Sequence, residues 1–170
     1  NTEIKDFLLK TSHLENFDAD TCNSVLKINN SAEMLGYLLG KNIFLESKQF
    51  TDDKGNNVIA YDYIQLFRSF LASKSKELLP TEIQKSIYYN TSLYYRSISD
   101  HEKAIDFALL SGNPEYYEEL LLQNFDEFFI NGKFEKLWKW IDQIDENKLI
   151  NKKHFYYFKG VLSKYYLGKL

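Results

Sequence analysis

The chain has 170 residues, a formal net charge of −3 and 44% hydrophobic residues. This length and apolar content suffice for one sizeable domain or two small ones, and they exclude a disordered chain. With 7 glycines and 2 prolines against 13 tyrosines and 13 phenylalanines, the composition favours packed helices over a turn-rich all-β fold. The small net charge gives no sign of a nucleic-acid or anionic-membrane surface.

The cysteine content and the hydropathy bound the cellular setting. The single cysteine, Cys22, cannot form an internal disulfide, and no apolar stretch approaches the roughly 20 residues of a membrane span. We therefore expect a cytoplasmic protein without a membrane partner. The sequence starts at Asn1 with no signal-peptide pattern and ends at Leu170 within an apolar helical pattern, so we also expect a piece of a longer chain.

Residues 1–79 are predicted to form a winged-helix-like module, which opens with three helices. The first lies between Lys5 and Leu14, and the second is capped by Asp18. The third begins near Ser31, whose hydroxyl we expect to cap the free amides, and ends at Gly40.

A hairpin and a fourth helix complete this module. Two extended runs, 42–45 and 58–61, flank a polar turn at 52–57, and they predict an antiparallel hairpin. The apolar spacing from about Asp62 to Lys76 predicts the fourth helix. Three helices, a hairpin and a helix follow the winged-helix order, and a generic small α+β domain is the alternative.

Residues 80–170 are predicted to form a second, wholly helical domain that begins at Pro80. Apolar residues recur at helical spacing, and Gly112-Asn113-Pro114 reads as a helix-ending glycine, an N-cap and a proline at the first helical position. Further breaks fall near Ser99, Gly132 and Gly168.

The spacing of these breaks is close to the period of about 34 residues in tetratricopeptide arrays, where each unit is an antiparallel helix pair. We therefore expect tetratricopeptide-like helical repeats, truncated at the C-terminal end. The predicted fold class of the whole chain is mainly α, with one β-hairpin.

Catalysis needs convergent nucleophiles, bases or metal ligands, and the sequence offers no such group. No two histidines have the one-turn spacing of a helical metal site; they are His13, His101 and His154. Cys22 is expected in the core, and the acidic stretches 115–119 and 142–146 are expected to be solvated helix faces. We therefore expect no enzyme activity, cofactor or metal in this chain.

The third helix lacks the chemistry of a DNA-recognition helix. Between Ser31 and Lys41 the only charged residues are Glu33 and Lys41 itself, whereas readers of the major groove present Arg, Lys, Asn or Gln. The turn at 52–57 has two aspartates against one lysine, which opposes phosphate binding. DNA binding by this module is therefore only a minor alternative.

Three aromatic residues are the candidates for contact with a partner or effector, namely Tyr95, Tyr117 and Trp140. Tyrosine pairs on helices point about 100° apart, so one member of a pair can be exposed, although core packing is the competing interpretation. Trp138 and Trp140 cannot share one helical face, and we expect Trp140 to contribute to a contact surface.

Four stretches of the sequence resemble the MalT-type regulators, large ATP-binding transcription factors with a LuxR-type DNA-binding end. In chain order they are Phe7-Leu8-Leu9-Lys10-Thr11-Ser12, Asn42-Ile43-Phe44-Leu45, Tyr61-Asp62-Tyr63-Ile64-Gln65-Leu66-Phe67-Arg68-Ser69-Phe70-Leu71 and Glu102-Lys103-Ala104-Ile105-Asp106-Phe107-Ala108-Leu109-Leu110-Ser111-Gly112-Asn113. The resemblance implies a nucleotide-binding domain upstream, a winged helix that packs against it in an ADP-locked state, and a helical superhelix that senses inducer.

Two positions depart from this family. Ile64 and Phe107 stand where the family often has histidine, and an isoleucine cannot donate a hydrogen bond to a nucleotide phosphate. We therefore expect ATP or ADP to bind a missing upstream domain, and DNA to bind only through missing domains. The leading hypothesis is a regulatory fragment that relays effector or partner binding to an adjoining ATPase switch. A free-standing helical-repeat scaffold that binds a protein is the alternative.

Overall fold

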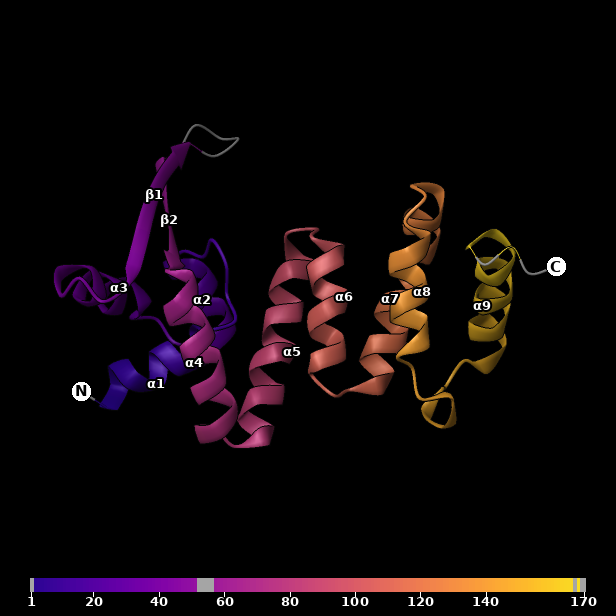
Figure 1. Cartoon of the computed structure of the whole chain (residues 1–170), viewed down its shortest axis with the longest axis horizontal. Coiled ribbons are helices and arrows are strands. Elements are labelled where there is room, and N and C mark those ends of the chain that lie inside the picture. Colours follow the sequence, from indigo (N-terminus) through magenta and orange to yellow (C-terminus); the bar gives the residue numbers. More distant parts are fainter. Residues whose placement is uncertain (1, 52–56, 167, 169–170) are drawn as a thin grey trace. The chain divides into compact units, whose positions relative to one another are not determined.

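The computed structural model describes residues 2–51, 57–166 and 168. It is mainly helical with one antiparallel hairpin, so the predicted fold class is confirmed (Figure 1). The chain divides into two compact units, residues 1–94 and 95–170. The domain boundary expected at Pro80, between residues 1–79 and 80–170, stays a prediction.

The first unit has the winged-helix order. Its elements are α1 (Thr2–Thr11), α2 (Ala19–Leu26), α3 (Ser31–Gly40), β1 (Leu45–Thr51), β2 (Asn57–Tyr63), α4 (Gln65–Leu78) and α5 (Thr81–Ser97) up to Tyr94. Asp62 and Tyr63, expected in the fourth helix, are the last residues of β2. The predicted turn of the hairpin lies, but for Asn57, outside the described residues.

The first strand of the hairpin begins later in the chain than the sequence predicts. Asn42 and Phe44 have positive φ angles of 51° and 40°, so residues 42–44 form a turn, and the strand begins only at Leu45. This turn closes α3, because the amide of Ile43 donates to the carbonyl of Leu38 at 3.1 Å. The expectation of an extended run was wrong for residues 42–44, because the carbonyls at the end of α3 need these donors.

A third segment pairs with the hairpin. The amide of Phe17 donates to the carbonyl of Tyr61 at 3.0 Å, and the amide of Tyr61 donates back at 2.7 Å. In the hairpin itself, Leu45 pairs with Tyr63 and Gln49 with Ile59. The isolated bridge ties the segment before α2 to the sheet.

The caps of α2 and α3 differ from each other in how well the sequence predicts them. Asp18 accepts the amide of Thr21 at 2.7 Å, which confirms it as the N-cap of α2. Ser31 is not the cap of α3: its hydroxyl is buried and has no hydrogen-bond partner, and its own amide donates to Asn23 at 3.2 Å. Asn30 occupies the N-cap position, so Ser31 is already the first helical residue, and Asn23 of the adjacent α2 accepts its amide.

One hydrophobic core joins the elements of the first unit. Its buried members are Phe7, Leu14, Phe17, Cys22, Val25, Met34, Leu35, Leu38, Tyr63, Leu71 and Ile87. Ile87 belongs to α5, so this helix packs on the winged helix. Cys22 is fully buried, as expected, and burial raises the pKa of its thiol.

Polar contacts reinforce the packing of α5 on the winged helix. Nε2 of His13 lies 2.8 Å from the hydroxyl of Thr91, and the amide group of Asn90 donates to the carbonyl of Val25 at 2.9 Å. The hydroxyl of Thr21 bonds that of Tyr94 at 2.8 Å. Segments about 65 to 78 residues apart are thus held together within one unit.

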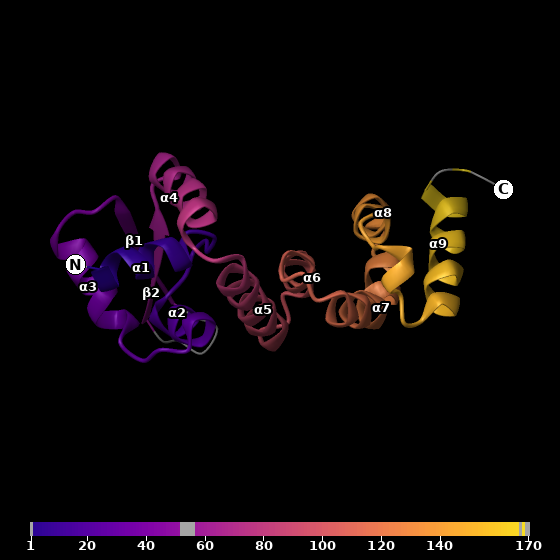
Figure 2. The ribbon, with the colours of Figure 1, turned by 90° about the horizontal axis from the view of Figure 1, so that it is seen from below.

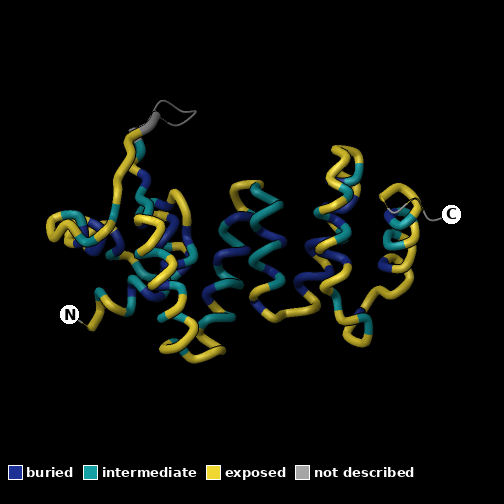
Figure 3. Tube along the Cα trace, in the orientation of Figure 1, coloured by how far each residue is buried: buried dark blue, intermediate teal, exposed yellow. Residues whose placement is uncertain are grey.

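The second unit consists of helices that pack in sequence. They are α6 (His101–Leu110), α7 (Pro114–Ile130), α8 (Phe134–Asp142) and α9 (Lys152–Tyr166), with a 3₁₀ turn, η1 (Glu146–Lys148), between the last two. Successive helices run in alternating directions and lie side by side (Figures 1 and 2), and α7 also contacts α9. Each carries buried residues along its length (Figure 3).

Short turns with the predicted chemistry join these helices. Gly112 has a φ of 67°, a left-handed conformation that only glycine adopts readily, and Asn113 caps α7 by accepting the amide of Tyr116 at 3.1 Å. Pro114 is the first residue of α7. Gly132, with a φ of 71°, forms the equivalent turn between α7 and α8. These features of the sequence prediction are confirmed.

Candidate functional site

The exposed face of α3 is the surface with which a winged helix would read DNA. It carries no charged side chain apart from one acid. Its exposed residues are Ala32, Glu33, Gly36, Tyr37 and Gly40. The ammonium of Lys41, just beyond the helix, lies 5.9 Å from the centre of the Tyr37 ring. None of these helical side chains is an Arg, Lys, Asn or Gln that could donate to base edges in the major groove.

An exposed apolar patch lies where the hairpin meets α4. The apolar patch consists of the exposed Phe44, Ile64 and Phe70 and of the partly buried Phe67 between them and the core. The rings of Phe44 and Phe67 are 5.0 Å apart, those of Phe67 and Phe70 are 6.3 Å apart, and the amide of Ile64 donates to the carbonyl of Phe44. Phe44 is 57% exposed and Phe70 55% exposed. Clustered exposed apolar residues of this kind are typical of protein-binding surfaces.

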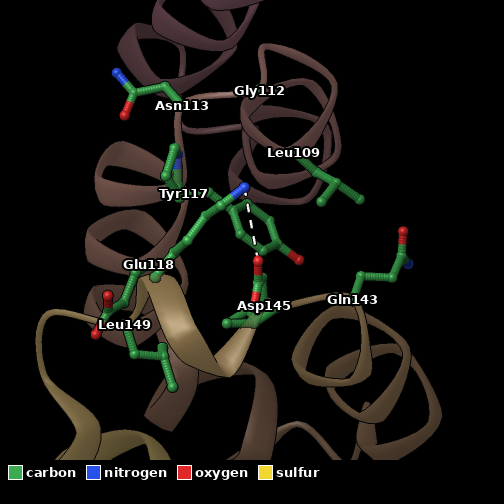
Figure 4. Close-up of a pocket in the computed structure, with 11 residues that line it drawn as sticks. Leu109, Gly112, Asn113, Tyr117, Glu118, Gln143, Asp145 and Leu149 are labelled. Carbon is green, nitrogen blue, oxygen red and sulfur yellow. Dashed lines mark ion pairs between the residues drawn. The ribbon is translucent and has the colours of Figure 1, made fainter.

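A pocket of about 160 Å³ lies within the second unit (Figure 4). It is formed by the α6–α7 turn, the first turns of α7 and the segment between α8 and α9. Its apolar lining comes from Leu109, Pro114, Tyr117, Ile144 and Leu149, and its polar lining from Gly112, Asn113, Glu118, Gln143, Asp145 and Lys148.

An ion pair lies in this pocket. Nζ of Lys148 is 3.6 Å from Oδ2 of Asp145 (dashed line in Figure 4), and both side chains are substantially exposed. Oδ1 of Asp145 accepts the amide of Asn147 at 3.1 Å, which caps η1. Chiefly this backbone hydrogen bond, with help from Lys148, lowers the pKa of Asp145 below its usual value.

Glu118 forms one side of the pocket and fixes the start of α9. Its carboxylate is buried and accepts the amide of Ile150 at 2.8 Å and that of Asn151 at 2.7 Å. Asn151 is the residue before α9, so Glu118 satisfies free amides at the helix start. The expectation that residues 115–119 form a solvated face is therefore wrong at Glu118, although Glu115 and Glu119 are exposed.

Two of the three aromatic candidates are brought together. The hydroxyl of Tyr117 donates to the carbonyl of Trp140 at 2.9 Å, and the indole of Trp140 donates to Asp106 at 2.7 Å. Trp140 is 1% exposed, whereas Trp138 is the partly exposed tryptophan. Trp140 was therefore placed on the wrong face, because its indole nitrogen finds a carboxylate on α6.

Tyr95 lies apart from that pair. Its buried ring stacks on Phe107 at 5.6 Å, and Nζ of Lys103 lies 4.9 Å from its centre. Of the three candidates only Tyr117 lines the pocket, where burial raises the pKa of its hydroxyl. The contact role of Tyr95, Tyr117 and Trp140 stays a prediction.

The sequence offers weak signals for the pocket residues that it did not single out. Asp145-Glu146-Asn147 has the spacing of an Asx turn, a local motif in which an aspartate accepts a nearby backbone amide. Glu118 has no such local signal, because its partners lie 32 and 33 residues away.

No group of three or more His, Cys, Asp or Glu side chains within residues 2–51, 57–166 and 168 is arranged to hold a metal ion. In the same part of the chain no helix has the length and apolar character needed to cross a membrane.

Comparison with known families bears on the first unit. This unit has the winged-helix order of elements, a bridge from Phe17 to the hairpin and a common hydrophobic core. Residues 1–83 match the family model of the MalT winged helix domain. The MalT-like winged helix relates this chain to transcription regulators, and the match includes α1 to α4 and the first residues of α5. A search of curated proteins finds no match.

Proposed function

We propose that this chain is a regulatory part of a transcription regulator, in which the MalT-like winged helix binds a neighbouring protein domain and relays signals from the helical unit. The apolar patch carries this proposal. Its partner would be the adjoining nucleotide-binding domain, which would hold the ATP or ADP.

The patch includes Ile64, one of the two positions at which this chain departs from the MalT-type regulators. Ile64 is 42% exposed and directly precedes α4. A histidine there could donate to a phosphate, whereas isoleucine offers only apolar surface. Contact through Phe44, Ile64 and Phe70 would therefore be with protein and not with the nucleotide itself.

The surface of α3 supports a role other than DNA reading. A recognition helix needs donors that reach bases and phosphates, and Ala32, Gly36 and Gly40 supply none. Promoter binding would then belong to another domain of the regulator.

Helix α5 supports the relay. Residues Ile87 to Tyr94 are fixed on the winged helix by core packing and by the contacts of Thr91, Asn90 and Tyr94. The last turn of the same helix belongs to the helical unit. The alternating helices α6 to α9 would be the tetratricopeptide-like sensor, with no enzymatic activity of its own.

Site-specific photo-crosslinking in the complete gene product tests the proposal. A benzophenone amino acid at Phe70 should crosslink within the protein, to a nucleotide-binding domain identified by mass spectrometry. The same probe at Tyr157, an exposed residue of α9 outside the patch, is the control. Crosslinks from Phe70 to DNA, or a gene product without an upstream phosphate-binding loop, would contradict the proposal. The second outcome would favour a free-standing scaffold.

A further inference from the structure

We infer that the pocket in the helical unit binds a small free amino acid with an apolar side chain. This inference rests on the proposed regulatory function, for which it names the class of effector. Three properties of the pocket carry it: its size, its apolar side chains and its exposed, loosely paired opposite charges.

The size and lining fit a branched aliphatic side chain. The pocket has a volume of about 160 Å³, and a cavity of about 150 Å³ lined by apolar side chains accepts benzene. Leu109, Ile144 and Leu149 supply aliphatic walls. A leucine or valine side chain would remove this surface from water, which is the favourable term for a ligand of this size.

The charges fit the two ends of a zwitterion. Nζ of Lys148 and Oδ2 of Asp145 are 3.6 Å apart, which is beyond the usual N–H···O distance. An exposed pair of this kind contributes little to stability, so ligand groups can replace it at small cost. The ligand carboxylate would accept from Lys148, and the ligand ammonium would donate to Asp145.

The other acid in the pocket is not available to a ligand. Each oxygen of Glu118 already accepts a backbone amide, at 2.8 Å from Ile150 and 2.7 Å from Asn151. Asp145 differs, because its Oδ2 makes only the loose contact with Lys148 while Oδ1 caps η1. One cation and one anion are therefore left to select the ligand.

A bound ligand would also act on α9. Leu149 lines the pocket and is followed directly by the two amides that Glu118 holds. Figure 4 shows Glu118 and Leu149 side by side at one end of the pocket. Occupation of the pocket would steady residues 145–151 and so protect the first turn of α9 from opening.

Calorimetric titration of the chain with L-leucine tests the inference. Saturable binding is expected, together with slower hydrogen exchange of the amides at the start of α9. Two analogues of the same side chain, 4-methylpentanoate and 3-methylbutylamine, lack one charge each and should bind at least about tenfold more weakly.

Two variants assign the charges. Lys148→Met should weaken leucine about tenfold and leave the affinity for 3-methylbutylamine unchanged. Asp145→Asn keeps an Oδ1 acceptor for η1, and it should weaken leucine but not 4-methylpentanoate. Lys153→Met, an exposed lysine of α9 outside the pocket, is the matched control and should change nothing.

Absence of saturable leucine binding would overturn the inference, and so would equal binding of leucine and both analogues. These outcomes are separate from the crosslinking result at Phe70, which reports on the winged helix alone. A crosslink to the nucleotide-binding domain without leucine binding would keep the proposed function and remove this effector.

Discussion

Nε2 of His13 lies 2.8 Å from the hydroxyl of Thr91, a residue 78 positions further along the chain. His13 follows α1 and Thr91 belongs to α5, so this contact joins the two ends of the winged-helix sequence. The rings of His13 and Tyr88 are nearly perpendicular, and their centres are 5.4 Å apart. Together these contacts hold α5 on the module through a partly buried histidine.

This burial makes the first unit sensitive to acid. Desolvation lowers the pKa of His13 from 6.5 to about 4. The unfolded state takes up the proton first as the pH falls, so stability decreases between pH 6.5 and 4 and is unaffected by this group above that window. The loss amounts to at most about 3 kcal/mol.

Urea denaturation at several pH values measures this loss. His13→Gln removes the titrating group, so the difference in unfolding free energy between wild type and variant should shrink as the pH falls from 6.5 to 4. A difference that does not change with pH would show that folding does not desolvate the ring of His13.

Adjacent residues of α4 should respond in opposite ways to substitution. Leu71 is 4% exposed in the core, and Leu71→Ala should lower the unfolding free energy by about 2–5 kcal/mol. Phe70 is 55% exposed, and Phe70→Ser should cost less than about 1 kcal/mol while reducing the binding of a hydrophobic dye. A comparable loss in both variants would mean that Phe70 is a core residue.

Glu118 should stabilise the start of α9. Glu118→Gln replaces one carboxylate oxygen by an NH₂ group that cannot accept an amide, so we expect a loss of about 1.5–3 kcal/mol and faster hydrogen exchange at Ile150 and Asn151. Glu127→Gln, at an exposed position of the same helix, is the control. Equal effects of the two variants would contradict this account.

The buried indole of Trp140 should stabilise the fold through the hydrogen bond that its nitrogen donates to Asp106. Trp140→Phe deletes the donor to Asp106, leaves that carboxylate with one partner fewer, and should cost about 1.5–3 kcal/mol on chemical denaturation. Trp138→Phe, at the partly exposed position, should cost much less. If both substitutions cost the same, the hydrogen bond to Asp106 adds nothing.

The sequence predicts those parts of the fold that depend on local chemistry. Gly112, Asn113 and Pro114 specify a helix end, a cap and a helix start within three residues, and each has its expected role. Asp18 likewise acts on an amide three residues away. Such interactions are readable because both partners lie in one short segment.

Side chains whose partners are distant in sequence could not be placed in this way. Glu118 looks like a solvated acid until the segment before α9 folds against it, and Trp140 looks peripheral until Asp106 of α6 reaches its nitrogen. Ser31 is the first helical residue of α3 and not its cap, and its amide is accepted by Asn23 of the adjacent α2. In each case tertiary packing decided between two locally acceptable positions.

In the proposed function the winged helix binds protein and does not read DNA. The most direct test is the affinity of this chain for a pool of random-sequence DNA duplexes. Fluorescence anisotropy measures this affinity at several salt concentrations. The exposed face of α3 predicts no saturable binding at any of them. Affinity that falls linearly with salt on logarithmic axes, and that is lost when Lys41 is replaced by Glu, would contradict the account.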